Sequence, residues 1–162
     1  MDTHALVYQL IGQRRRLGAK ARAFFNQVER GQDTLLIPFT VLEEVMLLSE
    51  AWKIRLRLPF RELLISLMQA ENFELGVNDA ELLLEASALV GIRDPYDRLI
   101  VAQARIAGMP VVTGDEEIHA SGLVRIVWDL RSNLGQTLHT YQSLRPSPSA
   151  LVAINSDIEC YV

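Results

Sequence analysis

Four acidic residues, far apart in the sequence, stand where an α/β protein presents groups for chemistry. Asp2 precedes an apolar helix, and Glu44 lies one turn into a helix that follows a short apolar strand. Asp97 lies in the first turn of a third helix, and Asp115 follows a strand that ends at Thr113. If these acids converge, each carboxylate pair at about 4 Å repels by roughly 4 kcal/mol at an effective dielectric of about 20. Protonation or a divalent cation must relieve that repulsion.

A cluster of carboxylate ligands suits Mg²⁺ or Mn²⁺ rather than zinc, and it is typical of metal-assisted phosphodiester cleavage. Each acid also has an ordinary structural explanation. Asp97, with Asp94, is explained as a helix cap, and Asp115 as a turn residue. Glu44 is explained as part of a solvated helix face, and Asp2 as a frayed terminus. From composition and spacing alone, the sequence therefore predicts an α/β domain and leaves the acidic site open.

The elements that would position these acids alternate between short strands and helices. Strands are expected over four short apolar runs, at 34–38, 73–77, 109–113 and 124–128. Helices are expected at 5–10, 17–28, 41–48, 59–68, 78–89 and 95–106. Thr40, Asn78 and Asp94 are the expected N-caps, and Pro95 suits the first helical position. This alternation predicts a parallel sheet covered on both faces, with its ligand site beyond the carboxyl ends of the strands.

The charge balance excludes binding of nucleic acid by general electrostatic attraction. Sixteen Lys and Arg residues against twenty Asp and Glu residues give a net charge of −4, so any such role needs local basic patches. Arginine, which suits bidentate phosphate contacts, outnumbers lysine fourteen to two. The basic residues gather in two clusters, each also explained as a solvated helix face: Arg14, Arg15, Arg16, Lys20 and Arg22, then Lys53, Arg55, Arg57 and Arg61.

Length and composition indicate one ordinary domain. The chain has 162 residues, of which 49% are hydrophobic, enough to exclude disorder over most of its length. No apolar run is long enough to span a membrane, the start lacks the basic region of a signal peptide, and Cys160 is the single cysteine. We therefore expect a cytoplasmic protein. A stretch rich in Ser, Pro, Gln and Thr at 132–149 predicts a domain at 1–130 and a tail at 131–162, whose last run, 150–162, is apolar enough to dock.

Several stretches of the sequence resemble the motifs of one family. The run DPYDRLIVAQA at 94–104, followed by GMPVVTGD at 108–115, resembles a PIN domain, and more narrowly the VapC-type toxins of bacterial type II toxin–antitoxin pairs. DTHAL at 2–6 resembles the opening motif of that family. IPFTVLEE at 37–44 resembles the second motif, with Glu44 as its acid. The resemblance runs from Asp2 to about Trp128 in the order of the family.

The resemblance implies a PIN-like three-layer α/β/α fold with a central, mainly parallel sheet. It implies an endoribonuclease that depends on Mg²⁺, with Mn²⁺ as a substitute, and that cleaves single-stranded or looped RNA. Its implied partners are an inhibiting antitoxin protein and a second copy in a homodimer. Asp2, Glu44, Asp97 and Asp115 would be catalytic, and the three aspartates would hold the metal. The hydroxyls of Thr3, Thr40 and Thr113, together with Asp94, would orient the carboxylates, and the candidate RNA contacts are Arg93, Arg98, Arg14 and Arg15.

One departure from the family pattern concerns the start of the chain. Only Met1 precedes Asp2, where relatives carry a short hydrophobic strand, so either the start codon is misassigned or the central strand is truncated. A truncated strand favours an alternative function, a catalytically compromised PIN-like binding module. A third, weaker alternative is a phosphatase-like or response-regulator domain. A haloacid-dehalogenase-like enzyme would need an acid two residues after Asp2, but His4 stands there.

Overall fold

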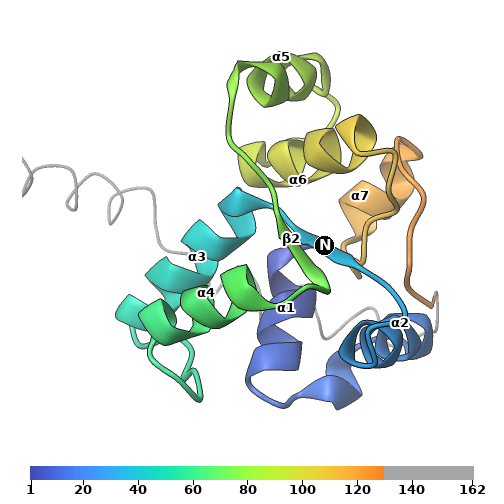
Figure 1. The fold of residues 1–162 in the computed structure, drawn as a ribbon. Coiled ribbons are helices and arrows are strands. Elements are labelled where there is room, and N and C mark those ends of the chain that lie inside the picture. The colour runs from blue at the N-terminus through green and yellow to red at the C-terminus, as the bar shows by residue number, and fades with distance from the viewer. Residues whose placement is uncertain (130–162) are drawn as a thin grey trace, which may run out of the picture.

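A computed structural model describes residues 1–129, which form short helices around a small parallel sheet (Figure 1). The predicted linker and tail at 131–162, with the apolar run at 150–162 and Cys160, lie outside the described residues. The elements are α1 (Thr3–Leu10), a 3₁₀ turn η1 (Arg14–Arg16), α2 (Ala19–Glu29), β1 (Leu35–Ile37), α3 (Phe39–Glu50), α4 (Phe60–Gln69), β2 (Phe73–Leu75), α5 (Ala80–Ala88), α6 (Pro95–Ile106) and α7 (Glu116–Ser121).

The sheet is parallel, as the alternation of strands and helices predicts. β1 pairs with β2 so that Leu35 lies opposite Phe73 and Ile37 opposite Leu75. Parallel strands of this kind need a crossover between them, and here the helices α3 and α4 form it. The α/β fold class is confirmed, and none of the helices in residues 1–129 has both the length and the apolar character needed to cross a membrane.

The two remaining expected strands, 109–113 and 124–128, shorten to one parallel bridge between Val111 and Ile126. Residues 1 and 2 lie between this pair and the β1–β2 sheet. The amide of Asp2 donates to the Val112 carbonyl at 3.0 Å, and the amine of Met1 donates to the Leu36 carbonyl at 3.4 Å. These two hydrogen bonds link the two halves of the sheet beside Asp2.

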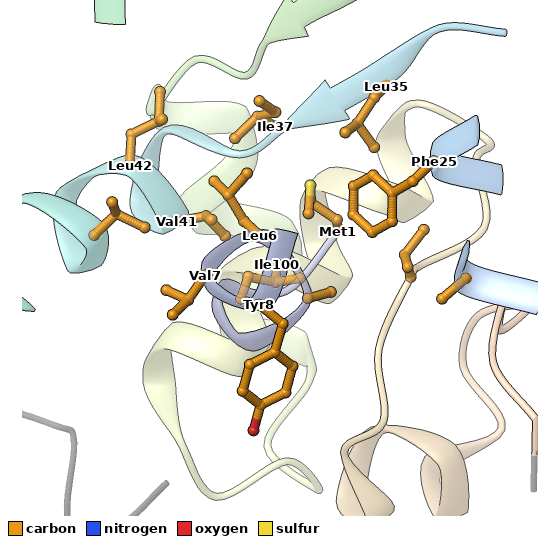
Figure 2. Close-up of a cluster of buried hydrophobic side chains, with 14 of the residues drawn as sticks. Met1, Leu6, Val7, Tyr8, Phe25, Leu35, Ile37, Val41, Leu42 and Ile100 are labelled. Carbon is orange, nitrogen blue, oxygen red and sulfur yellow. The ribbon is translucent and has the colours of Figure 1, made fainter. Parts of the chain in front are cut away.

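Helix α6 lies between two hydrophobic clusters and contributes to both. Ile100 and Ala104 belong to the larger cluster, in which Met1, Leu6 and Phe25 face β1 (Figure 2). On the neighbouring side of α6, Val101 and Ala102 pack with the side chains of α5 and α7 in the smaller cluster. Because α6 is held from both sides, its first turn, which carries Asp97, has a fixed position. The smaller cluster comprises Leu82, Ala86, Leu89, Ile92, Val101, Ala102 and Ile118.

Two of the three expected N-caps were wrong by one or two residues. Pro38, not Thr40, caps α3: the Pro38 carbonyl accepts from Val41. Asp79, not Asn78, caps α5, and its side chain accepts from the Leu82 amide. A common cause explains both errors, because the Thr40 hydroxyl donates to Oδ1 of Asn78 at 3.4 Å. These two side chains therefore link the first turn of α3 to the segment before α5 instead of capping their helices.

Candidate active site

Asp2 is fixed at the start of α1 and is not a frayed terminus. Its Oδ1 accepts from the Ala5 amide at 2.7 Å, which makes Asp2 the N-cap of the helix. The residue is 3% exposed, and its second oxygen, Oδ2, is buried without a hydrogen-bond partner within residues 1–129. One oxygen thus holds the helix, and the other is left for a ligand.

The Asp94-Pro95 start of α6 forms as predicted. Oδ1 of Asp94 accepts from the Tyr96 amide at 2.8 Å and from the Asp97 amide at 3.4 Å, and Pro95 occupies the first turn. Asp94 is therefore engaged as the cap. Asp97, one turn further, is buried. The cap and the packing of α6 between two clusters together hold a carboxyl in a place that water scarcely reaches.

Asp115 follows the 109–113 segment and caps α7. Its Oδ1 accepts from the amides of Glu117 at 2.8 Å and Ile118 at 3.0 Å. Thr113 supports this turn, because its hydroxyl oxygen accepts from the Asp115 amide at 2.9 Å. A ring nitrogen of His119 also contacts the Thr113 carbonyl at 2.9 Å. The turn that carries Asp115 is therefore held by side chains on both sides.

Glu44 lies on α3 but is buried, so the solvated-face explanation fails for it. The Thr3 hydroxyl, from the first turn of α1, donates to Oε2 of Glu44. This contact ties α1 to α3, two helices that pack together. Thr3 thus contacts the Glu44 carboxylate and Thr113 the Asp115 amide, whereas the Thr40 hydroxyl donates to Asn78.

The four acids converge, as their electrostatic effects on one another show. Burial raises the pKa of Asp97 to about 8, and the negative charges of Asp115, Asp2 and Glu44 add to the rise. Burial also raises the pKa of Asp2 to about 6, and Asp115 adds to that rise, whereas the polar Thr113 side chain and the hydrogen bond from the Ala5 amide oppose it. We call Asp2, Glu44, Asp97 and Asp115 the acidic centre.

The acidic centre fits a hard divalent cation by its chemistry. All of its ligand atoms are carboxylate oxygens, and the buried Oδ2 of Asp2 lacks a partner within residues 1–129. In the same part of the chain, no three His, Cys, Asp or Glu side chains stand close enough to hold an ion by themselves. Mg²⁺ is often held by one or two carboxylates, with waters and substrate phosphates completing its shell, so a three-residue cage is not required.

The four candidate arginines differ in their surroundings. Arg98 and Arg93 flank the start of α6, beside the acidic centre, and Nη2 of Arg98 donates to the Arg93 carbonyl at 3.4 Å. Arg93 also pairs with Glu117, with 3.5 Å between Nε and Oε1. Arg14, in η1 after the C-terminal end of α1, pairs with Glu29 at 3.2 Å. Arg15 is exposed on η1. Of these four arginines, Arg93 and Arg98 are the two at the start of α6, the helix that carries Asp97.

Three residues that matter to the site were missed in the sequence. The charge of Glu117 adds to the pKa rise of Asp97, and Glu117 also accepts from the Arg93 amide. Tyr96 lies near Glu44, because burial and then the charges of Glu44 and Glu43 raise the pKa of the Tyr96 phenol. The adjacent sequences Asp115-Glu116-Glu117 and Tyr96-Asp97 were the available signals. For Trp128, by contrast, no neighbouring residue in the sequence indicates a role at the site.

Trp128 contacts the turn that carries Asp115 without contacting the acids themselves through any described hydrogen bond. Its indole ring rests on Gly114, where a Cβ atom would lie only 2.8 Å from the ring, so only glycine fits there. Gly18 meets the same ring and the Asp129 amide. Oδ2 of Asp129 in turn accepts from the Ala19 amide at the start of α2. We call Trp128 and Asp129, with these contacts, the C-terminal clamp; it seats the turn between Thr113 and Asp115.

Comparison with known proteins agrees with this geometry. The sequence model of the PIN domain family matches residues 1–122, which include all four members of the acidic centre. No protein with a curated description matches the chain. PIN domains are typically metal-dependent nucleases, and the match covers well over half of the sequence. The chain therefore belongs to the PIN domain family.

Proposed function

We propose that this PIN domain is a Mg²⁺-dependent endoribonuclease whose catalytic residues are Asp2, Glu44, Asp97 and Asp115. The observation that carries the proposal is the state of Asp97. A buried carboxyl whose pKa is raised to about 8 by burial and by four neighbouring acids is costly to keep ionised without a counter-charge. Perturbed groups of this kind are typical of functional sites rather than of ordinary helix caps.

In the proposed mechanism, Asp2, Asp97 and Asp115 would hold the ion, in part through water molecules. When bound, a divalent cation lowers the pKa of an attacking water and offsets negative charge on the phosphate. Glu44, whose carboxylate accepts from the Thr3 hydroxyl, would orient the nucleophilic water. Arg93 and Arg98, at the start of α6, would contact the phosphate backbone. The caps at Asp2 and Asp115 fix their carboxyl groups before substrate arrives.

The decisive experiment compares the full chain with an Asp97→Asn variant on single-stranded RNA, with and without Mg²⁺ or Mn²⁺. Asparagine keeps the size of the side chain and removes the charge, so the variant should fold and lose metal-dependent cleavage. Asp33→Asn is the matched control, because Asp33 is exposed and touches only the neighbouring Thr34 amide. Full activity in Asp97→Asn would refute the assignment.

A second candidate function is a PIN-like binding module that does not cut RNA. One observation favours it: no three His, Cys, Asp or Glu side chains in residues 1–129 stand close enough together to hold an ion. Calorimetric titration with Mn²⁺ separates the two functions. Binding that disappears in Asp97→Asn supports the nuclease, and no binding at millimolar metal supports the module.

The narrower assignment is a VapC-type toxin, inhibited by an antitoxin protein and acting as a homodimer. Its support is the resemblance of four motifs in family order, from Asp2 to about Trp128. Expression of the chain in bacteria should arrest growth, and co-expression of a small protein encoded beside it should restore growth. Expression of Asp97→Asn should be harmless. If the wild-type chain is equally harmless, the toxin assignment is wrong, although the nuclease assignment can still hold.

A further inference from the structure

An exposed tryptophan stands at the turn between α3 and α4, away from the acidic centre. Trp52 is 83% exposed and has a φ of 56°, the left-handed conformation that no other non-glycine residue in residues 1–129 adopts. The Lys53 amide donates back to the Leu48 carbonyl at 2.9 Å and the Trp52 amide to Ser49 at 3.2 Å. These bonds close the end of α3 in the way that usually places glycine at this position.

A tryptophan at this position does not stabilise the fold in an obvious way. A bulky side chain rarely adopts the left-handed conformation, and here its ring gains little by burial, because most of its surface faces solvent. Backbone strain of this kind gathers at binding sites. An exposed, strained aromatic residue therefore indicates a ligand that covers the ring.

Basic residues flank Trp52 in the sequence, and two of them, Arg55 and Arg57, take part in no ion pair within residues 1–129. The stretch 51–61 contains Lys53, Arg55, Arg57 and Arg61 and has no Asp or Glu. Within residues 1–129, the ion pairs involve Arg14, Arg93 and Arg105, and neither Arg55 nor Arg57 takes part in one. Both are exposed. Their charges are therefore available to an anionic ligand.

The loop also encloses space for a ligand. A hollow of about 620 Å³ is lined by Trp52, Arg55, Arg57, Leu58 and Phe60 among others. The guanidinium of Arg57 lies so close to Gly12 that a Cβ there would be 2.6 Å from Nη2. This contact joins the loop to the turn that leads into η1, where Arg15 is exposed. Folding thus brings together parts of both basic clusters that the sequence shows separately.

We propose that Trp52, Arg55 and Arg57 form a platform that binds single-stranded RNA: a base stacks on the indole, and the arginines contact phosphates. The naming of RNA rests on the proposed function. Every base offers a π-face to an aromatic ring, and a paired base in a duplex does not expose that face. Glu44 lies on α3, and Trp52 follows two residues after the end of that helix. The eight positions between them correspond to roughly 12 Å at about 1.5 Å per residue, so we infer that one strand reaches both the centre and the platform within a few nucleotides.

The test measures binding apart from cleavage. Fluorescence anisotropy of a labelled oligouridylate of about 12 nucleotides, in EDTA, reports the affinity of the full chain. Trp52→Ala should weaken binding about tenfold, and Trp52→Phe should retain most of it. Arg55→Gln and Arg57→Gln should each lower the slope of log affinity against log salt by about 0.7. Met68→Ala removes an exposed large apolar side chain and Arg30→Gln an exposed arginine elsewhere; both are controls and should change neither the affinity nor the salt slope.

A Trp52→Gly variant excludes loss of binding through misfolding. Glycine suits the left-handed position, so this variant should unfold at an equal or higher urea concentration while its RNA binding falls as in Trp52→Ala. Quenching of tryptophan emission by the oligonucleotide should disappear in both variants, leaving only the signal of Trp128.

The outcomes separate the platform from the nuclease. If Trp52→Ala binds RNA as tightly as the wild type, the platform is wrong, even where RNA is cleaved. If binding depends on Trp52 but no RNA is cleaved, the platform stands and the nuclease assignment fails. RNA binding that is indifferent to Trp52, together with Trp52-dependent binding of an acidic protein, would assign this surface to a protein partner and overturn the proposal.

Discussion

The acidic centre and the loop around Trp52 treat charge in opposite ways. In the centre, like charges are buried together, and the pKa of Asp97 rises to about 8 as a result. Around Trp52, like charges of the other sign stand in solvent, where Arg55 and Arg57 remain without acidic partners in the described part of the chain. The buried acids repel one another strongly, and a bound cation can relieve that repulsion. The arginines around Trp52 repel one another little, because solvent screens their charges.

This difference separates two contributions to function. Relief of buried repulsion gives a large energy, suited to holding a cation and to chemistry. Contacts made by solvated arginines are individually weak and depend on salt, suited to positioning a substrate. Substitutions in the centre should therefore change both stability and rate strongly, and substitutions around Trp52 should change binding with little effect on stability. The following predictions test this contrast, from the largest expected effect to the smallest.

The largest effect is expected for cleavage. Asp97→Asn should lower the rate of metal-dependent RNA cleavage by roughly a thousandfold, because a metal site contributes several kcal/mol to the transition state. Arg57→Gln should lower it only a few-fold at low salt. Initial rates with a labelled single-stranded RNA measure both. Comparable losses in the two variants would contradict the division between centre and loop.

Next in size is the pH dependence of stability without metal. A carboxyl whose pKa is raised on folding binds more protons in the native state, so the free energy of unfolding falls as pH rises from the ordinary value to the raised one. Asp97 acts between about pH 4 and about pH 8, and Asp2 between about pH 4 and about pH 6. Burial lowers the pKa of the Met1 amine to about 6, partly offset by Asp2, so this group favours folding as pH rises from about 6 to about 8.

Because both carboxyls act between about pH 4 and about pH 6, the sum is a fall of roughly 4 kcal/mol there, at about 1.4 kcal/mol per pKa unit for each group, and then a plateau. Urea unfolding in EDTA across this range measures it. Asp97→Asn should reduce the fall and replace the plateau by a rise. Added Mg²⁺ should stabilise the wild type most above about pH 6. A free energy of unfolding that does not change with pH in the wild type would mean that burial and mutual repulsion do not raise the pKa values of these acids.

The C-terminal clamp offers a third test. Gly114→Ala places a methyl group 2.8 Å from the Trp128 ring, so the Asp115 turn must move. Overpacking of this kind costs about 1–3 kcal/mol, and we expect cleavage to fall with it. Gly91→Ala is the control, since no atom lies within 4 Å of a Cβ there. Thermal unfolding together with the cleavage assay gives both quantities. A Gly114→Ala variant that matches Gly91→Ala in both would remove any role for the clamp.

The smallest effect separates a cap inside the centre from one outside it. Asp115→Ala and Asp79→Ala each remove the N-cap of a helix and should each cost about 1 kcal/mol of stability. Only Asp115→Ala should also abolish cleavage. Urea midpoints and cleavage rates together decide the matter. Equal cleavage by the two variants would show that Asp115 is a cap and nothing more.

Much of this architecture could be predicted because its signals are local. The start of α6 follows from the order Asp94, Pro95 and Asp97, which lie within one turn of each other. The N-caps at Pro38 and Asp79 could not, since a contact between Thr40 and Asn78 across two loops decides them. The start of α2 shows the same limit. Its amides are capped by Asp129, a partner more than a hundred positions away in the chain.

The acidic centre was predictable as a set of residues, but its energetics were not. Motif order identified Asp2, Glu44, Asp97 and Asp115, while their burial depends on how α1, α3 and α6 pack. The loop around Trp52 shows the opposite case. Its basic residues were visible in the sequence, but the left-handed backbone at Trp52 and the approach of Arg57 to Gly12 arise only on folding.

The C-terminal clamp has a practical consequence for anyone who trims the gene. A fragment ending at residue 122, where the family match stops, would discard Trp128 and Asp129. It would strip the ring from Gly114 and the acceptor from the first amides of α2. A fragment ending at 129 should keep the conformation of the turn between Thr113 and Asp115. The shortest fragment expected to fold with this turn intact must therefore include Trp128, and it is longer than the segment matched by the family model.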